Sequence, residues 1–347
     1  MKRMLSYYAK KRWHIVLITS LILLAITFVY LIDADYVYDR ELWDQYGNVI
    51  SVQKTPQHSP FGLLSSFAAI LATIVPIFEF YYKMRKVSVD QFHALPIKRE
   101  KIYLAKYIVC LAEILIPLTL SFIASLILIV IKENIFHLEY FIVFYLALVF
   151  VTIVLFTSIS FVYTRCNTFF DGLINILAYS IILVPIVSII TMIFDIKYRF
   201  GDPSWFFLYS PITRITVILD QLFEYGYLGG NEVKVMDYIS LPIFIAFGVL
   251  SFILFIKLNK EEKSENSMQI SKSRFAYKLT LPAYIIPLMA MSIESSSPIL
   301  MVLVVIFGYF GYVVYRRSFK LTKYDYYMLF INVVMGLILG IVLGIFV

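Results

Sequence analysis

The chain has 347 residues, of which 61% are hydrophobic, 17% aromatic and only 15% charged, and its net charge is +7. A soluble domain carries nearer a quarter of charged residues, so this composition excludes an ordinary soluble protein. Several apolar runs exceed the ~20 residues that cross the hydrocarbon core of a bilayer. We therefore predict an all-α polytopic membrane protein that forms a single integral-membrane domain over residues 1–347.

The apolar runs predict nine transmembrane helices with the N-terminus in the cytoplasm. Short loops rich in Lys and Arg stay on the cytoplasmic side, and on this map most of the basic residues fall in inner segments. Segments 33–60 and 195–237 are then external, and 257–278 is a polar cytoplasmic linker. The predicted spans are 13–32, 61–82, 102–131, 140–164, 172–194, 237–256, 279–293, 299–315 and 324–347.

A short helix is predicted in the cytoplasmic segment between the second and third spans. Ser88 is a favourable N-cap residue. Val89, Phe92 and Leu95 then recur every third residue and give one apolar face. Pro96 ends the helix, because it pushes the residue before it out of the α region. A helix of about two turns is marginal alone in water, so we expect it to pack on the bilayer surface or on a cytoplasmic partner.

The run VDQFHALPIKREKIYLAKYIVCLAEILIPL, residues 89–118, resembles a segment of a known family. It is similar to the start of the third span in ABC-2 type permeases of low-GC Gram-positive bacteria, the branch that includes exporters of antimicrobial and cytolytic peptides. The matching positions are His93, Ala94, Leu95, Pro96, Ile97, Arg99, Glu100, Ile102, Tyr103, Leu104, Ala105, Lys106 and Tyr107. A second family pattern, near 263–265, is matched only loosely.

The resemblance implies how such a protein would work. In these permeases the short helix before the run is a coupling helix that docks in a groove of an ATPase. Two ATPase copies bind ATP and Mg, and a second permease, identical or different, completes the transporter in the bacterial plasma membrane. The chain itself would carry no cofactor and bind no nucleic acid. The residues to which the resemblance gives an ATPase-coupling role are Ser88, Asp90, Gln91, Phe92, His93, Leu95, Pro96, Lys98 and Arg99.

The sequence carries no enzyme signature. It lacks a phosphate-binding glycine loop, so we expect no ATP hydrolysis by this chain. Its four His residues are scattered, which argues against a metal site. The cargo implied by the resemblance is a hydrophobic or amphipathic peptide, such as a toxin or an antimicrobial.

The acidic residues Glu79, Glu113 and Asp171 lie in or beside predicted spans. A charge at mid-bilayer costs at least ~2.5–3.5 kcal/mol and usually marks a pathway or an ion pair. Glu113 either lines a substrate pathway or is a structural partner of a neighbouring polar group. Glu79 and Asp171 lie near the inner surface, where we expect them to pair with Lys or Arg of the loops.

Two other classes of function stay open. One is an ion-coupled secondary transporter that uses Glu113 as its proton carrier and needs no ATPase. The other is a membrane immunity or scaffold protein that transports nothing. In the external segment 195–237, an apolar face that begins at Pro211 predicts a helix on the outer leaflet. The inner turn 165–171 is a candidate second contact for an ATPase.

Overall fold

A computed structural model of the chain describes residues 2–33, 37–43, 49–56, 59–94, 97–132, 138–182, 235–260, 264–271 and 273–346. The predicted outer helix from Pro211 lies outside the described residues, as do the outer half of the span 172–194 and both Leu95 and Pro96.

Each predicted span overlaps a helix of the structure. These helices are α1 (Lys2–Asp33), α2 (Ser59–Phe80), α4 (Arg99–Lys132), α5 (Leu138–Thr164), α6 (Phe169–Ile181), α10 (Val235–Lys260), α11 (Tyr277–Glu294), α12 (Pro298–Arg316) and α13 (Lys323–Phe346). Among the described residues, six helices are long and apolar enough to cross a membrane: α1, α2, α4, α5, α12 and α13. The predicted class, a multi-pass helical membrane protein, is confirmed. The number of nine crossings stays a prediction.

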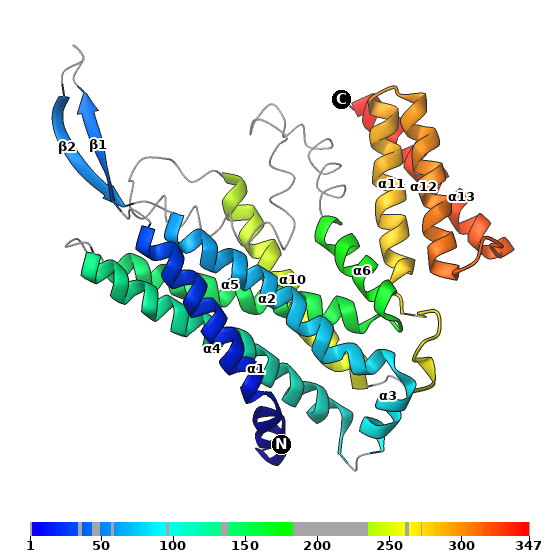
Figure 1. The fold of residues 1–347 in the computed structure, drawn as a ribbon. Coiled ribbons are helices and arrows are strands. Elements are labelled where there is room, and N and C mark those ends of the chain that lie inside the picture. Colours follow the sequence, from blue (N-terminus) through cyan, green and yellow to red (C-terminus); the bar gives the residue numbers. More distant parts are fainter. Residues whose placement is uncertain are drawn as a thin grey trace.

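One hairpin interrupts the helical architecture. Strand β1 (Val37–Trp43) pairs antiparallel with β2 (Val49–Pro56), with Val37 opposite Pro56 and a register shift between Leu42 and Trp43. The hairpin projects from one end of the helices (Figure 1). The all-α prediction did not include these strands. Their β-branched and aromatic residues favour extended chain over helix, and this preference was the available signal.

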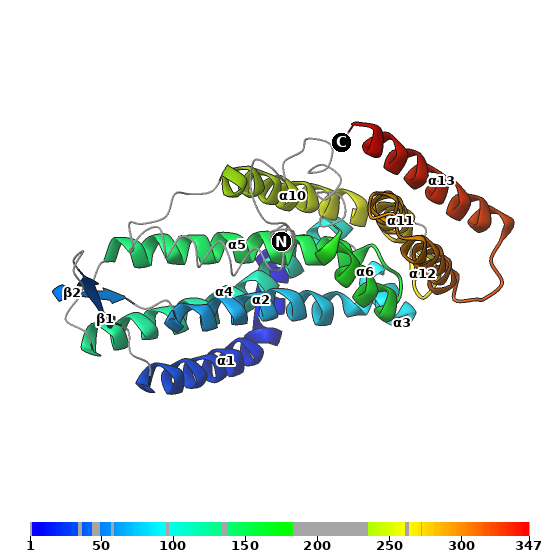
Figure 2. The same ribbon diagram turned by 90° about the horizontal axis from the view of Figure 1, so that it is seen from above.

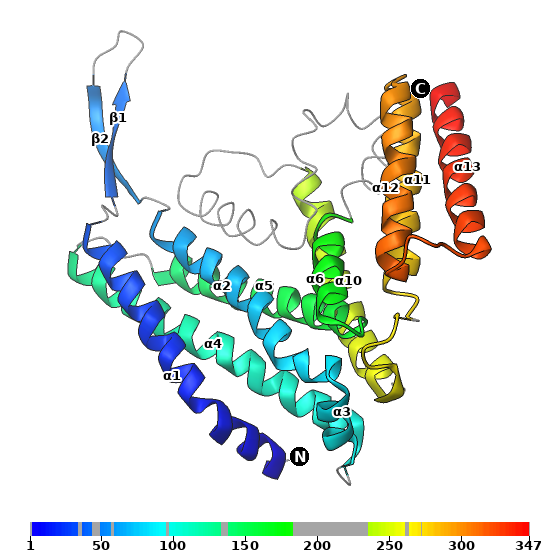
Figure 3. The ribbon, with the colours of Figure 1, turned by 45° about the vertical axis from the view of Figure 1, so that its right-hand side comes forward.

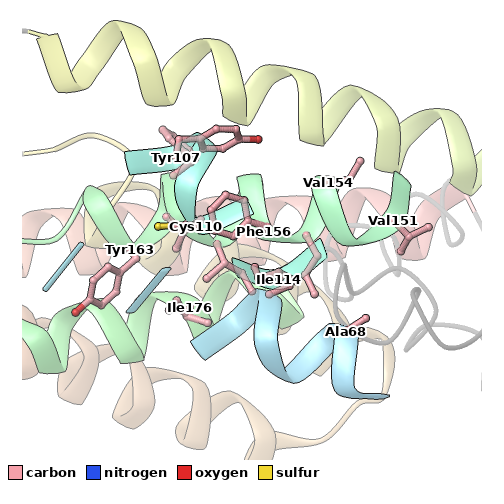
Figure 4. Close-up of a cluster of buried hydrophobic side chains, with 14 of the residues drawn as sticks. Ala68, Tyr107, Cys110, Ile114, Val151, Val154, Phe156, Tyr163 and Ile176 are labelled. Carbon is pink, nitrogen blue, oxygen red and sulfur yellow. The ribbon is translucent and has the colours of Figure 1, made fainter. Parts of the chain in front are cut away.

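The main bundle is built around α5. Figure 2 shows α5 between α10 on one side and α2 with α4 on the other, and α1 lies against α4. Its core joins all of these helices, and Figure 4 shows Ile114 of α4 and Phe156 of α5 inside it. A buried hydrogen bond of 2.6 Å between the Tyr107 and Thr157 hydroxyls ties α4 to α5. These contacts hold α2, α4 and α5 against one another.

The helices α11, α12 and α13 form a second group beside the bundle (Figure 3). Their own core contains Ile285, Met289, Val304, Tyr312 and Leu329. The turn between α12 and α13 is closed by Arg316, whose Nε and one terminal nitrogen each lie 2.8 Å from the carboxylate oxygens of Asp325. Such a two-point contact fixes orientation as well as distance.

Helices α11 and α13 approach each other at two glycines of α13. A Cβ on Gly336 would lie 2.8 Å from the Ile286 carbonyl oxygen, and one on Gly340 would lie 3.0 Å from that of Ala290. Small residues spaced by four positions let membrane helices touch along their backbones. Gly344 continues the spacing, but a Cβ there would meet no atom within 4 Å.

We expect Gly340→Leu to destabilise the protein by about 1–3 kcal/mol, because the added side chain overpacks a backbone contact. Gly344→Leu is the matched control and should leave stability unchanged. Thermal unfolding can be followed with a thiol-reactive dye, since Cys110 and Cys166 are both free and buried. Equal unfolding temperatures for the two variants would show that α11 and α13 do not pack as described.

Candidate functional site

The short helix α3 (Lys86–His93) lies between α2 and α4, after the 3₁₀ turn η1 (Tyr81–Met84). Arg85 takes the N-cap position with an extended backbone, φ −113° and ψ 117°. The Val89 N–H donates to the Arg85 carbonyl at 3.0 Å, so the first helical turn already contains Ser88. The predicted N-cap at Ser88 is therefore wrong. The 3₁₀ turn ends at Met84, so the chain turns into the helix at Arg85, earlier than the capping pattern indicated.

The inner face of α3 packs on the protein itself. Val89 is only 3% exposed. The Phe92 ring lies 4.6 Å from the ring of Tyr82 in η1. The Lys106 Nζ of α4 lies 4.2 Å from the centroid of the Phe92 ring and 3.5 Å from that of Tyr82. Val89 and Phe92 therefore pack on η1 and α4, which the prediction of a bilayer or a partner did not include; Leu95, the third residue of this face, lies outside the described residues.

The outer face of α3 is open. Val87 is 72% exposed, and Asp90 and Gln91 are exposed beside it. The predicted coupling residues differ in how exposed they are. Phe92 points inward, whereas Asp90, Gln91 and Lys98 are exposed. Ser88 and Arg99 are half-buried, and His93 is the last residue of the helix.

Four charged residues lie together where α1, α2 and α4 meet above α3: Arg12, Glu79, Lys106 and Glu113. We call them the buried charge cluster. Arg12 forms an ion pair with Glu79, whose other oxygen lies 3.3 Å from the Lys106 Nζ. The Arg12 Nε lies 3.8 Å from a Glu113 oxygen, an ion-pair distance without a hydrogen bond. The two carboxylates and Lys106 are almost fully buried, so their charges depend on one another for stabilisation.

Glu79 pairs with basic residues, as expected. The prediction that these lie in loops is wrong, because Arg12 belongs to α1 and Lys106 to α4. The two interpretations of Glu113 stay predictions. Glu113 is 3% exposed and faces Arg12. Sequence reasoning missed Arg12 and Lys106 as partners. Lys106 and Glu113 are seven residues apart, about two turns on one helical face, which was the available signal.

The linker after α10 contacts α3, the 3₁₀ turn η1 and the turn between α5 and α6. It contains the 3₁₀ turn η3 (Ser264–Asn266), which packs on α3. The Ser267 hydroxyl donates to the Lys83 carbonyl at 3.1 Å, and the Ser271 hydroxyl to the Arg165 carbonyl at 2.7 Å. The linker therefore connects η1 with the turn between α5 and α6.

An ion pair between Arg317 and Asp171 joins the loop after α12 to the start of α6. Asp171 accepts hydrogen bonds from Arg317 at 2.6 Å, from the Thr168 hydroxyl at 2.6 Å and from the Tyr277 hydroxyl at 3.1 Å. The predicted pairing of Asp171 with a basic loop residue is confirmed. The bond from Tyr277 also attaches α11 to α6.

The described contacts connect α3 with three helices. In the part of the chain that the structure describes, no three His, Cys, Asp or Glu side chains lie close enough to hold a metal ion. A force on α3 acts through Phe92 on Lys106, and from there through Glu79 on α1 and α2. The arrangement can therefore pass a displacement of α3 into α1, α2 and α4.

Comparisons with protein-family models, with curated proteins and with solved structures give no match. The resemblance to ABC-2 type permeases stays a prediction that depends on residues 89–118.

We expect Glu79→Gln to lower stability by about 3–5 kcal/mol, because the buried Lys106 ammonium then loses the carboxylate 3.3 Å away and Arg12 keeps only Glu113, at 3.8 Å. Glu100→Gln is the control. It breaks a 2.9 Å ion pair with Lys260 that is largely exposed, and such pairs are worth only about 0–1 kcal/mol. Unfolding temperatures of the two variants in detergent measure the difference. A loss in Glu79→Gln no larger than that in Glu100→Gln would show that the cluster does not stabilise the bundle.

Proposed function

We propose that the chain is the membrane-spanning subunit of an ABC exporter in the bacterial plasma membrane, and that α3 receives the motion of a separate ATPase. The observation that carries the proposal is the division of α3 into a fixed inner face and an open outer face. Phe92 and Val89 anchor the helix, while Val87, Asp90 and Gln91 are free for a partner.

A partner that pushes on a short helix needs that helix to be stiff. An eight-residue helix is marginal alone, and here its packing on η1, η3 and Lys106 supplies the missing stability. Because the chain has no phosphate-binding loop, ATP and Mg belong to the ATPase. We infer two ATPase copies and a second permease, identical or different, as in the family that residues 89–118 resemble.

The groove between α1 and α4 supports a hydrophobic or amphipathic peptide as cargo. Its volume is about 780 Å³, and apolar side chains such as Trp13, Leu17 and Ile116 make up most of its walls. Arg12 is the one charged side chain among the described residues that line it. A volume of this size suits a ligand with a large apolar surface and few polar groups.

The outer face of α3 is tested by Val87→Asp. Each ABC ATPase encoded beside the gene for this chain is co-expressed with it, and the purified complex is assayed for ATPase retention and ATP hydrolysis. We expect the variant to weaken ATPase binding at least about tenfold, since a central interface contact is worth ~1.4 kcal/mol or more.

Tyr7→Asp is the matched control, because Tyr7 of α1 is also highly exposed but lies on another helix. It should retain the ATPase. Phe92→Ala should lower both ATPase retention and thermal stability, because Phe92 faces inward. Full ATPase retention by Val87→Asp would overturn the docking role of α3.

An ion-coupled transporter is the second candidate, and it is favoured by one observation. Glu113 is a carboxyl buried within α4; among the described residues its ion-pair partner is Arg12, and its Oε1 oxygen accepts no hydrogen bond there. A carboxyl in such a place can act as a proton carrier.

Uptake of a fluorescent amphipathic peptide into inside-out proteoliposomes separates the candidates. We expect uptake to require the ATPase and ATP, to persist with a protonophore and to survive Glu113→Gln. Uptake without an ATPase that stops with the protonophore and in Glu113→Gln would establish the second candidate. No uptake under either condition would favour a scaffold or immunity protein.

A further inference from the structure

A groove lies between the start of α6 and the end of α12, apart from α3 and the buried charge cluster. Its volume is about 480 Å³. Its walls are apolar, with Ile174 of α6 facing Val313 and Val314 of α12. Its described lining residues come from α6, α12 and the segments next to them, and none belongs to α11.

Two aromatic side chains flank the cytoplasmic end of the groove. Phe170 is 74% exposed and Phe319 is 73% exposed, and both line the cavity. Exposed Phe rings at the end of an apolar helix offer surface on which an apolar ligand or lipid can pack. The groove therefore runs from the predicted inner membrane surface along two helices toward the hydrocarbon core.

The loop at the polar end of the groove is basic. The charged residues that line the groove are Arg317 and Asp171, which form an ion pair. The segment 316–323 reads RRSFKLTK and has four cationic residues and no acid. Arg316 is neutralised by Asp325, whereas the side chains of Lys320 and Lys323 are exposed and add positive charge to the loop whose Ser318 and Phe319 line the groove.

Arg317 is fixed at the lining of the groove. Its guanidinium donates to Asp171 at 2.6 Å, to the Thr168 hydroxyl at 3.0 Å and to the Met268 carbonyl at 3.3 Å. These contacts use three of the five N–H groups of an arginine, and the side chain remains 40% exposed. The group is thus held in one orientation with donors left for an anionic ligand.

The geometry points to a binding site for one anionic phospholipid. Its phosphate contacts Arg317 and the positive charge of 316–323, and an acyl chain lies along Ile174, Val313 and Val314. The occupant must be apolar at the depth of the spans and anionic at the surface, and an anionic lipid has both properties. Basic pockets between helices on the cytoplasmic side bind such lipids. This inference does not depend on the exporter proposal.

The test uses the full chain in a neutral detergent. Phosphatidylglycerol or phosphatidylcholine with the same acyl chains is added, and thermal unfolding and lipid retention by native mass spectrometry are measured. We expect phosphatidylglycerol to raise the unfolding temperature at least about 3 °C more than phosphatidylcholine does, as a ligand in large excess over its Kd would. Equal shifts for the two lipids would overturn the site.

Val314→Trp fills the groove without changing charge and should abolish the preference for phosphatidylglycerol. Val302→Trp is the control, since Val302 is an exposed residue of the same helix outside the groove, and it should keep the preference. An unchanged preference in Val314→Trp would place the lipid elsewhere and overturn the proposal.

The double variant Asp171→Asn with Arg317→Gln removes both charges of the pair, so neither is left buried alone. We expect it to lose the preference for phosphatidylglycerol. If it keeps the preference, Arg317 serves only to neutralise Asp171. A shift with inorganic phosphate equal to that with phosphatidylglycerol would assign a soluble anion instead. Loss of ATPase binding in Val314→Trp with intact lipid preference would assign a protein partner, and either result overturns the lipid site.

Discussion

The surface around α3 depends most on the contacts of one side chain, Lys106. Its ammonium group lies between the Glu79 carboxylate and the rings of Tyr82 and Phe92. A cation is attracted both by a carboxylate and by the faces of aromatic rings, and both attractions strengthen when water is excluded. One buried charge therefore joins α2 and α4 to the short helix below them.

The remaining inner contacts extend this connection sideways. The linker packs on α3 and binds the backbone of η1 and of the turn after α5. Arg317 and Tyr277 then join Asp171 at the start of α6. Backbone carbonyls, hydroxyls and ion pairs form these links, so the surface around α3 is held together by directional contacts, whereas apolar packing is the main contact within the bundle, with the Tyr107–Thr157 hydrogen bond added to it. A partner bound at α3 would act on the bundle through a connected surface, not through one loop.

The sequence predicted the helices well, because length and apolar composition are local properties that a bilayer makes decisive. It also predicted that Glu79 and Asp171 would find basic partners, since an unpaired buried charge is costly. It could not identify those partners, because Arg12 is 67 residues from Glu79 and Arg317 is 146 residues from Asp171. The start of α3 was misplaced because a local capping pattern at Ser88 was overridden by the turn that precedes it. The inward packing of Phe92 was missed because it depends on Tyr82 and Lys106, which only the fold brings together.

The two glycines of α13 have a consequence for biosynthesis. Helix α13 packs on α11 and makes only slight contact with α12, its neighbour in sequence. The ribosome makes α11 first, so the strip of α11 that includes the carbonyls of Ile286 and Ala290 can meet the glycines of α13 only after the last helix has been made. The packing of α11, α12 and α13 is therefore complete only when α13, the last of the three in the chain, has packed on α11, the first.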